Sequence, residues 1–145
     1  MRIQRINYND PETVDVAVVN VSGASITLGN AVSFCTTANS ADGVNAVSPA
    51  TSNVASFAGI ALATIPNTNA GLVRAYGICN STAIFATGAS TTVALGIVLG
   101  PGVAGSLGVN SLGLTYALGP LVAMETYGAA VNSPGGFAKT FVRAL

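Results

Sequence analysis

The sequence predicts an all-β protein, because three features of the chain favour short strands over helices. β-Branched and aromatic residues alternate with small or polar ones over short runs. Gly, Pro, Asn and Ser punctuate these runs at spacings of about ten residues. Helical spacing is confined to weak candidates in the Ala-rich parts. Many short strands of this kind are typical of a β-sandwich or a β-barrel.

The chain divides into an arm, residues 1–13, and a single β domain, residues 14–145. The arm holds charges, Asn and Pro11 without an apolar period, and 145 residues suit one domain with such an extension. Two interpretations of this extended N-terminal arm stay open. It is a loose tail, or it docks on a neighbour through charge pairs and added-strand hydrogen bonds.

The first strands of the domain show period-two alternation. Val14, Val16 and Val18 alternate with Asp15 and Ala17, and the β-branched run continues to Val21. Two short runs and a long polar loop follow: Ile26–Leu28, which ends at the turn signal Gly29–Asn30, then Val32–Phe34, then residues 36–53.

A second group of strands begins at Phe57–Ile65, which is apolar on both faces and is expected to be buried. After the turn Pro66–Gly71, Leu72–Cys79 is the clearest strand, and Arg74 and Tyr76 share one of its faces. The remaining expected strands are Ala83–Ala86, Val93–Leu99, Leu114–Leu118, Leu121–Thr126 and Ala138–Ala144.

Charge is scarce and unevenly placed. Charged residues make up 7% of the chain, against about 25% in an ordinary soluble domain, and the net charge is zero. Half of them precede position 16: Arg2, Arg5, Asp10, Glu12 and Asp15. A surface with so few charges is weakly solvated, and near-zero net charge favours association. We therefore expect other protein subunits to cover much of the surface.

The same composition argues against several partners. Without clustered Lys and Arg, neither nucleic acid nor an anionic membrane surface is expected as a partner. The most apolar run, Val93–Gly105, is shorter than the ~20 residues that span a bilayer, and Gly and Pro interrupt it. The polar N-terminus is unlike a secretory signal. Cys35 and Cys79 are then expected to be reduced and buried.

Catalytic and metal-binding chemistry is poorly provided for. The chain has no His, so neither a Ser-His-Asp nor a Cys-His arrangement is available. Two Cys without His do not complete a zinc shell. Beyond position 16 the carboxylates are Asp42 and Glu125, which no motif links. We expect no enzyme, no catalytic residue, no metal, no cofactor and no small-molecule substrate.

The candidate site residues are therefore contact residues for other subunits. Tyr and Arg are enriched at the centres of protein interfaces, and Tyr76 serves either there or in core packing. Glu125 forms either an ion pair within the chain, with Arg74, Lys139 or Arg143, or a bridge between subunits. The full candidate set is Arg2, Arg5, Asp10, Glu12, Asp15, Arg74, Tyr76 and Glu125.

Five segments resemble the small decoration, or cement, proteins of tailed-phage capsids. They are Phe57–Leu62 (FAGIAL), Gly71–Asn80 (GLVRAYGICN), Val93–Leu99 (VALGIVL), Leu121–Thr126 (LVAMET) and Lys139–Leu145 (KTFVRAL). The resemblance covers about 60% of the chain, from Phe57 to Leu145, and leaves out the N-terminal third and Gly100–Gly119.

The resemblance implies a compact β-barrel or β-tulip domain, often a homotrimer, on the outer surface of the virion. Such proteins are made in the host cytoplasm, bridge major capsid protein subunits and have no catalytic residues. The alternative is a self-assembling coat, fibre or tail structural subunit. A carbohydrate-binding β-sandwich is a weaker alternative, because the chain has few aromatic residues and no Trp.

Overall fold

The structure, a computed structural model, is all-β and describes residues 12–37, 42–49, 56–85, 92–101, 107–109, 121–128 and 136–144. No α-helix occurs within these ranges. The strands are β1 (Val14–Asn20), β2 (Ala31–Phe34), β3 (Asn45–Val47), β4 (Phe57–Ala61), β5 (Ala70–Phe85), β6 (Thr92–Val93), β7 (Val98–Pro101), β8 (Leu107–Val109), β9 (Leu121–Ala123), β10 (Tyr127–Gly128) and β11 (Gly136–Arg143).

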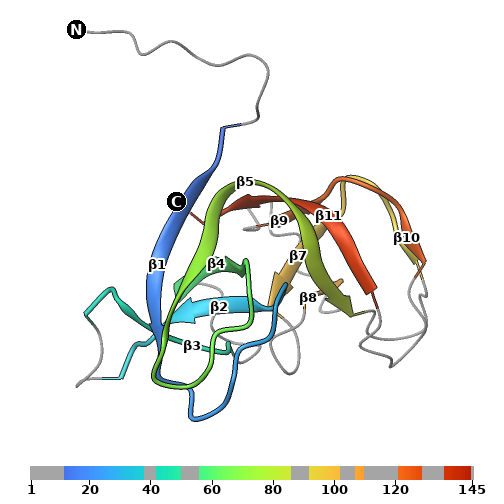
Figure 1. The fold of residues 1–145 in the computed structure, drawn as a ribbon. Coiled ribbons are helices and arrows are strands. Elements are labelled where there is room, and N and C mark those ends of the chain that lie inside the picture. The colour runs from blue at the N-terminus through green and yellow to red at the C-terminus, as the bar shows by residue number, and fades with distance from the viewer. Residues whose placement is uncertain are drawn as a thin grey trace, which may run out of the picture.

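Nine of these strands form one sheet whose hydrogen bonding closes on itself twice. The order is β1-β3-β2-β4-β5-β11-β9-β7-β8, and further pairings join β1 to β5 and β5 to β8. The first half of β5 thus closes a ring with β1, β3, β2 and β4, and its second half closes a ring with β11, β9, β7 and β8. In Figure 1, β5 arches across the molecule and links the two rings.

β5 is longer than the sequence predicts, because Leu72–Cys79 and the segment from Ala83 belong to one strand. β11 pairs with β5 from Tyr76 to Ile84, with a bulge between the pairs Cys79↔Thr140 and Thr82↔Ala138. A bulge shifts the alternation by one residue. Odd-numbered residues of β5 are buried from Val73 to Cys79, and Thr82 and Ile84 are buried beyond the bulge.

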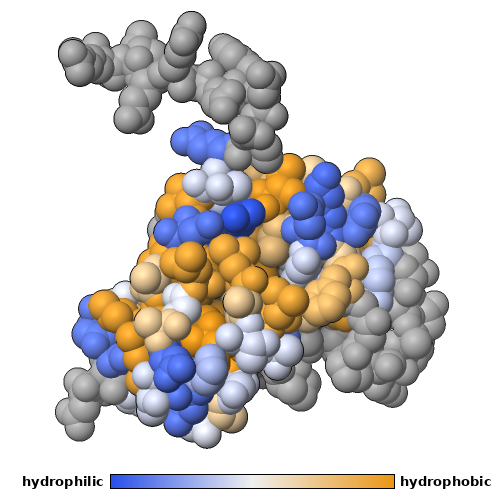
Figure 2. Space-filling model, in the orientation of Figure 1, coloured by the Kyte–Doolittle hydropathy of each residue, from blue (hydrophilic) through white to orange (hydrophobic). Residues whose placement is uncertain are grey.

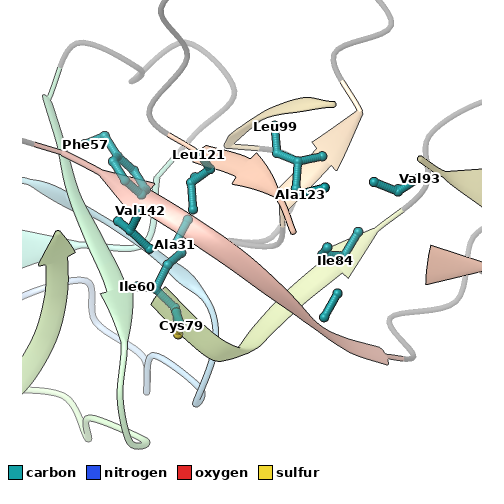
Figure 3. Packing of buried hydrophobic residues seen from close by; sticks show 11 residues of the cluster. Ala31, Phe57, Ile60, Cys79, Ile84, Val93, Leu99, Leu121, Ala123 and Val142 are labelled. Atoms are coloured by element: carbon teal, nitrogen blue, oxygen red, sulfur yellow. The ribbon is translucent and has the colours of Figure 1, made fainter. Parts of the chain in front are cut away.

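Two apolar clusters fill the two rings, and β2 and β4 contribute to both. Phe57 and Ile60 of β4 lie in the larger cluster, whereas Ala58 and Ala61 lie in the smaller one. Figure 3 shows the larger cluster, where side chains of β4, β5, β9 and β11 point toward one another. The prediction that this segment is buried on both faces is confirmed for β4, although the strand ends at Ala61 and not at Ile65.

The predicted strand Val93–Leu99 is wrong, because the chain turns at Leu95 and Gly96. Gly96 has a φ of 82°, and its N–H donates to the Ala123 carbonyl at 2.8 Å. β6 and β7 therefore lie on either side of a turn. Val93 and Leu99 are both buried, which explains why their spacing resembled one face of a strand.

Other differences are local. The polar segment 36–53 contains β3, which pairs with both β1 and β2. Ile26 makes an isolated bridge to Ile65 and no strand. β9 ends at Ala123, before the bend at Met124 and Glu125. The predicted strand Leu114–Leu118 lies outside the described residues, as do residues 1–11 of the predicted arm.

The predictions for β1, β2 and β11 are confirmed to within a few residues. Cys35 and Cys79 are both buried and outside any disulfide, as the sequence predicts. Cys35 follows β2, where its N–H donates to the Asn45 carbonyl at 2.8 Å, and Cys79 lies in the larger apolar cluster. The two thiols therefore report on different rings.

Candidate functional site

The outer face of β5 is the clearest candidate for a functional surface. Val73, Ala75 and Cys79 are buried, whereas the alternate residues are wholly or partly accessible, as the period of a strand requires. The accessible residues are Leu72, Arg74, Tyr76 and Ile78. We call these four residues, with their neighbours on β1 and β11, the outer face.

The registers of β1 and β11 set the breadth of this face. Tyr76 pairs with Val14 of β1 and also with Arg143 of β11. Because a strand residue has one partner on each edge, β1 and β11 lie on opposite edges of β5. The outward pairs across the face are Ala17↔Leu72, Asp15↔Arg74, Val14↔Tyr76, Tyr76↔Arg143 and Ile78↔Phe141.

Arg74 and Asp15 form an ion pair at the centre of this face. Arg74 Nε lies 2.8 Å from Asp15 Oδ1, and Nη2 lies 3.1 Å from Oδ2. Arg74 Nη1 also donates to the Ile78 carbonyl at 2.7 Å. Hydrogen bonding to Asp15 raises the pKa of Arg74 above its ordinary value. Both charges are thus engaged within the chain, in the bidentate geometry that arginine forms with carboxylates.

Tyr76 packs on the outer face beside Phe141. Their ring centroids lie 5.3 Å apart with an interplanar angle of 78°, an edge-to-face contact. Leu72 is 52% exposed and Val14 is 39% exposed. Figure 2 shows apolar surface over β1 and β5, interrupted by small polar patches. The face is thus apolar and aromatic around one closed ion pair.

One glycine positions the N-terminal edge of this face. Gly77 has a φ of 106°, and a Cβ there would lie 2.5 Å from the Glu12 carbonyl oxygen and 2.9 Å from Thr13 Cγ2. Glu12 and Thr13 therefore lie against β5 at Gly77, just before β1 begins. A larger residue at position 77 would displace them.

The candidate residues from the sequence are spread across several parts of the molecule. Asp15, Arg74 and Tyr76 meet on the outer face, and Glu12 lies at its margin. Glu125 lies at the bend after β9, where its Oε1 accepts a hydrogen bond from the Lys139 N–H at 2.6 Å. Its partner is thus backbone, not the side chain of Arg74, Lys139 or Arg143. Arg2, Arg5 and Asp10 lie outside the described residues.

Sequence reasoning missed Leu72 and Phe141 as members of the site. Leu72 and Phe141 alternate in phase with Arg74 and Arg143 respectively, so period-two alternation on each strand places them outward. They meet on one face because of the register between β5 and β11. Alternation within a single strand does not determine that register.

A hollow of about 610 Å³ opens beside the start of β2 and the end of β3. Hydroxyl and amide groups form much of its wall: Ser22, Ser25, Thr27, Asn30, Thr37 and Ser48. None of the described residues in its wall carries a carboxylate, ammonium or guanidinium group. These residues offer hydrogen-bond donors and acceptors, not the ionisable pair that general acid–base catalysis uses.

The described residues hold no cluster of three or more His, Cys, Asp or Glu side chains suited to a metal ion. In the same ranges no helix is long and apolar enough to cross a membrane. No known family model matches the chain, and the curated proteins yield no significant match.

Proposed function

We propose that this chain is a structural virion protein that decorates a phage capsid and stabilises it by bridging major capsid subunits. The observation that carries the proposal is the outer face, which is apolar and aromatic around an ion pair closed within the chain. Exposed apolar patches of this kind mark protein contact surfaces. The proposal also draws on the five segments that resemble decoration proteins.

The mechanism is contact area and geometry. The low charge of the chain keeps the desolvation cost of burying its surface small, since few ions lose water. Burying a fully exposed leucine side chain contributes about 1.5–3 kcal/mol, so Leu72, half exposed, offers about half of that. Many such contacts, repeated over copies held on one shell, sum through multivalency to firm binding.

The proposed division of roles assigns the domain to contacts between copies and residues 1–11 to the capsid. Residues 1–11 include Arg2, Arg5 and Asp10, which would form charge pairs with adjoining capsid subunits. We group Glu12 and Thr13 with the domain, because they lie against Gly77 of β5.

Sedimentation of capsids with purified protein tests the proposal. Capsids of the encoding virus, prepared without this chain, are mixed with full-length protein or with a variant that lacks residues 1–11. We expect full-length protein to co-sediment at a fixed ratio per capsid, and the shortened variant to stay in the supernatant while keeping its fold by circular dichroism. Failure of full-length protein to bind, or its assembly alone into shells or tubes, would overturn the proposal.

A further inference from the structure

We propose that the outer face binds the outer face of a second copy of this chain, related by a two-fold axis parallel to β5. This inference rests on the proposed function only in treating the outer face as a protein contact. It names the occupant of that face and the charge pair that sets its orientation, Glu12 of one copy with Arg143 of the other.

The charges in the described part of the chain fall into two groups. Asp15 and Arg74 neutralise each other, Asp42 accepts hydrogen bonds from its own turn, and Glu125 accepts one from the Lys139 backbone. Glu12, Lys139 and Arg143 have side chains without an ion-pair or hydrogen-bond partner among the described residues. Glu12 and Arg143 are exposed, whereas Lys139 is half-buried, so these two exposed and opposite charges are the most accessible to another molecule.

The register places Glu12 and Arg143 on opposite flanks of the outer face. Arg143 pairs with Tyr76 from the β11 edge. Val14 pairs with Tyr76 from the β1 edge, and Glu12 lies beside Gly77 just before it. Glu12 and Arg143 thus lie near the same level of β5, one on each side of Tyr76.

This arrangement selects one way for two copies to meet. A two-fold axis parallel to β5 places the β1 flank of each copy over the β11 flank of the other, so each Glu12 faces an Arg143. An axis in the face but perpendicular to β5 would place Glu12 over Glu12 and Arg143 over Arg143. Like-charge contact disfavours that second arrangement. A two-fold contact is self-complementary, so the pair forms twice.

The centre of the face suits this contact. Stacked sheets lie about 10 Å apart, a gap that Glu and Arg side chains can bridge when they extend from opposite sides. Leu72, Tyr76 and Ile78 would occupy the middle. Arg74 makes three hydrogen bonds within its own chain. Covering it with apolar surface therefore leaves few of its N–H donors without a partner.

Charge reversal tests the contact in the full-length protein. Sedimentation velocity over a concentration series gives the dissociation constant of wild type, Glu12→Arg, Arg143→Glu and the double variant that exchanges both charges. We expect each single reversal to weaken self-association by about tenfold or more, because two like-charge contacts replace two attractive ones. The double variant should return to within about threefold of wild type.

Ser48→Glu is the matched control, because Ser48 is exposed and follows β3, away from the outer face. It should leave the dissociation constant unchanged. If a reversed variant does not fold, Glu12→Gln and Arg143→Gln should each weaken self-association, and combining them should weaken it no further, because either one alone already breaks the pair. A monomeric wild type, or a double variant no better than the singles, would overturn the inference.

The capsid assay separates this inference from the proposed function. Wild-type protein that is monomeric yet binds capsids would contradict the two-fold contact and leave the proposed function standing. Protein that self-associates with the expected charge dependence yet ignores capsids would support the contact and contradict the proposed function.

Discussion

Gly77 shows how a single residue determines the edge of the candidate site. Its φ of 106° is a conformation that side-chain-bearing residues rarely adopt, and the Glu12 backbone lies against it. Gly96 also has a positive φ, of 82°, but a Cβ there would meet nothing within 4 Å. A substitution at Gly96 therefore introduces conformational strain alone, whereas a substitution at Gly77 introduces both strain and a steric clash.

We expect Gly77→Ala to destabilise the protein by about 1–3 kcal/mol, more than Gly96→Ala, for which strain alone costs roughly 1–2 kcal/mol. The additional loss comes from displacing Glu12 and Thr13. Urea unfolding of the two variants measures the difference. Equal losses would mean that the contact of Glu12 and Thr13 with Gly77 adds nothing to stability.

Asp42 gives the turn before β3 a dependence on pH. Hydrogen bonds from the backbone N–H groups of Asn45 and Val44 hold the pKa of Asp42 below its ordinary value of 3.8. A lowered folded-state pKa contributes stability above the unfolded value, and that contribution is lost as pH falls through the folded value. The turn should therefore loosen only at pH values below 3.8.

An NMR titration checks this expectation at the Asp42 carboxyl carbon. Its midpoint should lie below that of an unstructured aspartate, and the amide shifts of Val44 and Asn45 should follow the same curve. Asp42→Ala should remove that acid transition from both amides. A midpoint at or above 3.8 would contradict the assignment.

At the scale of elements, the pairing of β5 with β11 ties the outer face to the second ring. Thr82 and Thr140 are fully buried, and their hydroxyl oxygens lie 2.7 Å apart across the two strands. Each hydroxyl therefore satisfies the other in an apolar setting. Replacing both hydroxyls with apolar groups should cost little stability, whereas removing one of them leaves the other buried without a hydrogen-bond partner and should cost more.

We expect Thr140→Val to cost about 1–3 kcal/mol, because it leaves the Thr82 hydroxyl buried without a partner. Thr82→Val should behave alike. The double variant should lose less than the sum of the two single losses. Chemical denaturation of all four proteins gives this cycle, and additive losses would show that the two hydroxyls act independently.

Alternation in the sequence predicts the strands that have one buried and one exposed face. β1 from Asp15 onward, the first half of β5 and β11 are of this kind, so alternation predicts their residues and faces. The predicted face of Val14 is wrong, because the register shifts between Val14 and Asp15 and leaves Val14 exposed. β3 was not predicted, because Asn45–Val47 lies in a polar run and depends on pairing with strands from elsewhere in the chain. The turn at Leu95 was hidden because the apolar residues around it keep a period of two.

The sequence predicts part of the candidate site in the same way. The sequence places Arg74 and Tyr76 on one face. It does not identify Asp15 as the partner of Arg74, because that pair depends on the register between two strands and joins residues 59 positions apart. Alternation places Asp15 in the first strand, where the structure has it, but alternation within one strand does not identify a partner on another.

At the scale of the whole molecule, the two rings should unfold together. They share β5, and β2 and β4 contribute side chains to both apolar clusters. Opening either ring would expose part of the other cluster. The fold should therefore behave as one cooperative unit.

Thiol labelling can test this cooperativity without an added probe. In Cys79→Ser the remaining Cys35 reports on the first ring, and in Cys35→Ser the remaining Cys79 reports on the second. With both variants brought to equal stability by denaturant, Cys79 should react no faster than Cys35, which also lines the hollow. Faster reaction of Cys79 would show that the second ring opens separately.

Closure of the main sheet should protect this apolar chain against fibre formation. A sheet with a free border strand is a template on which further chains can add without limit. Here, among the described residues, each strand of the nine-stranded sheet has neighbours on both sides, at least over part of its length. At high concentration we therefore expect particles of fixed size rather than filaments.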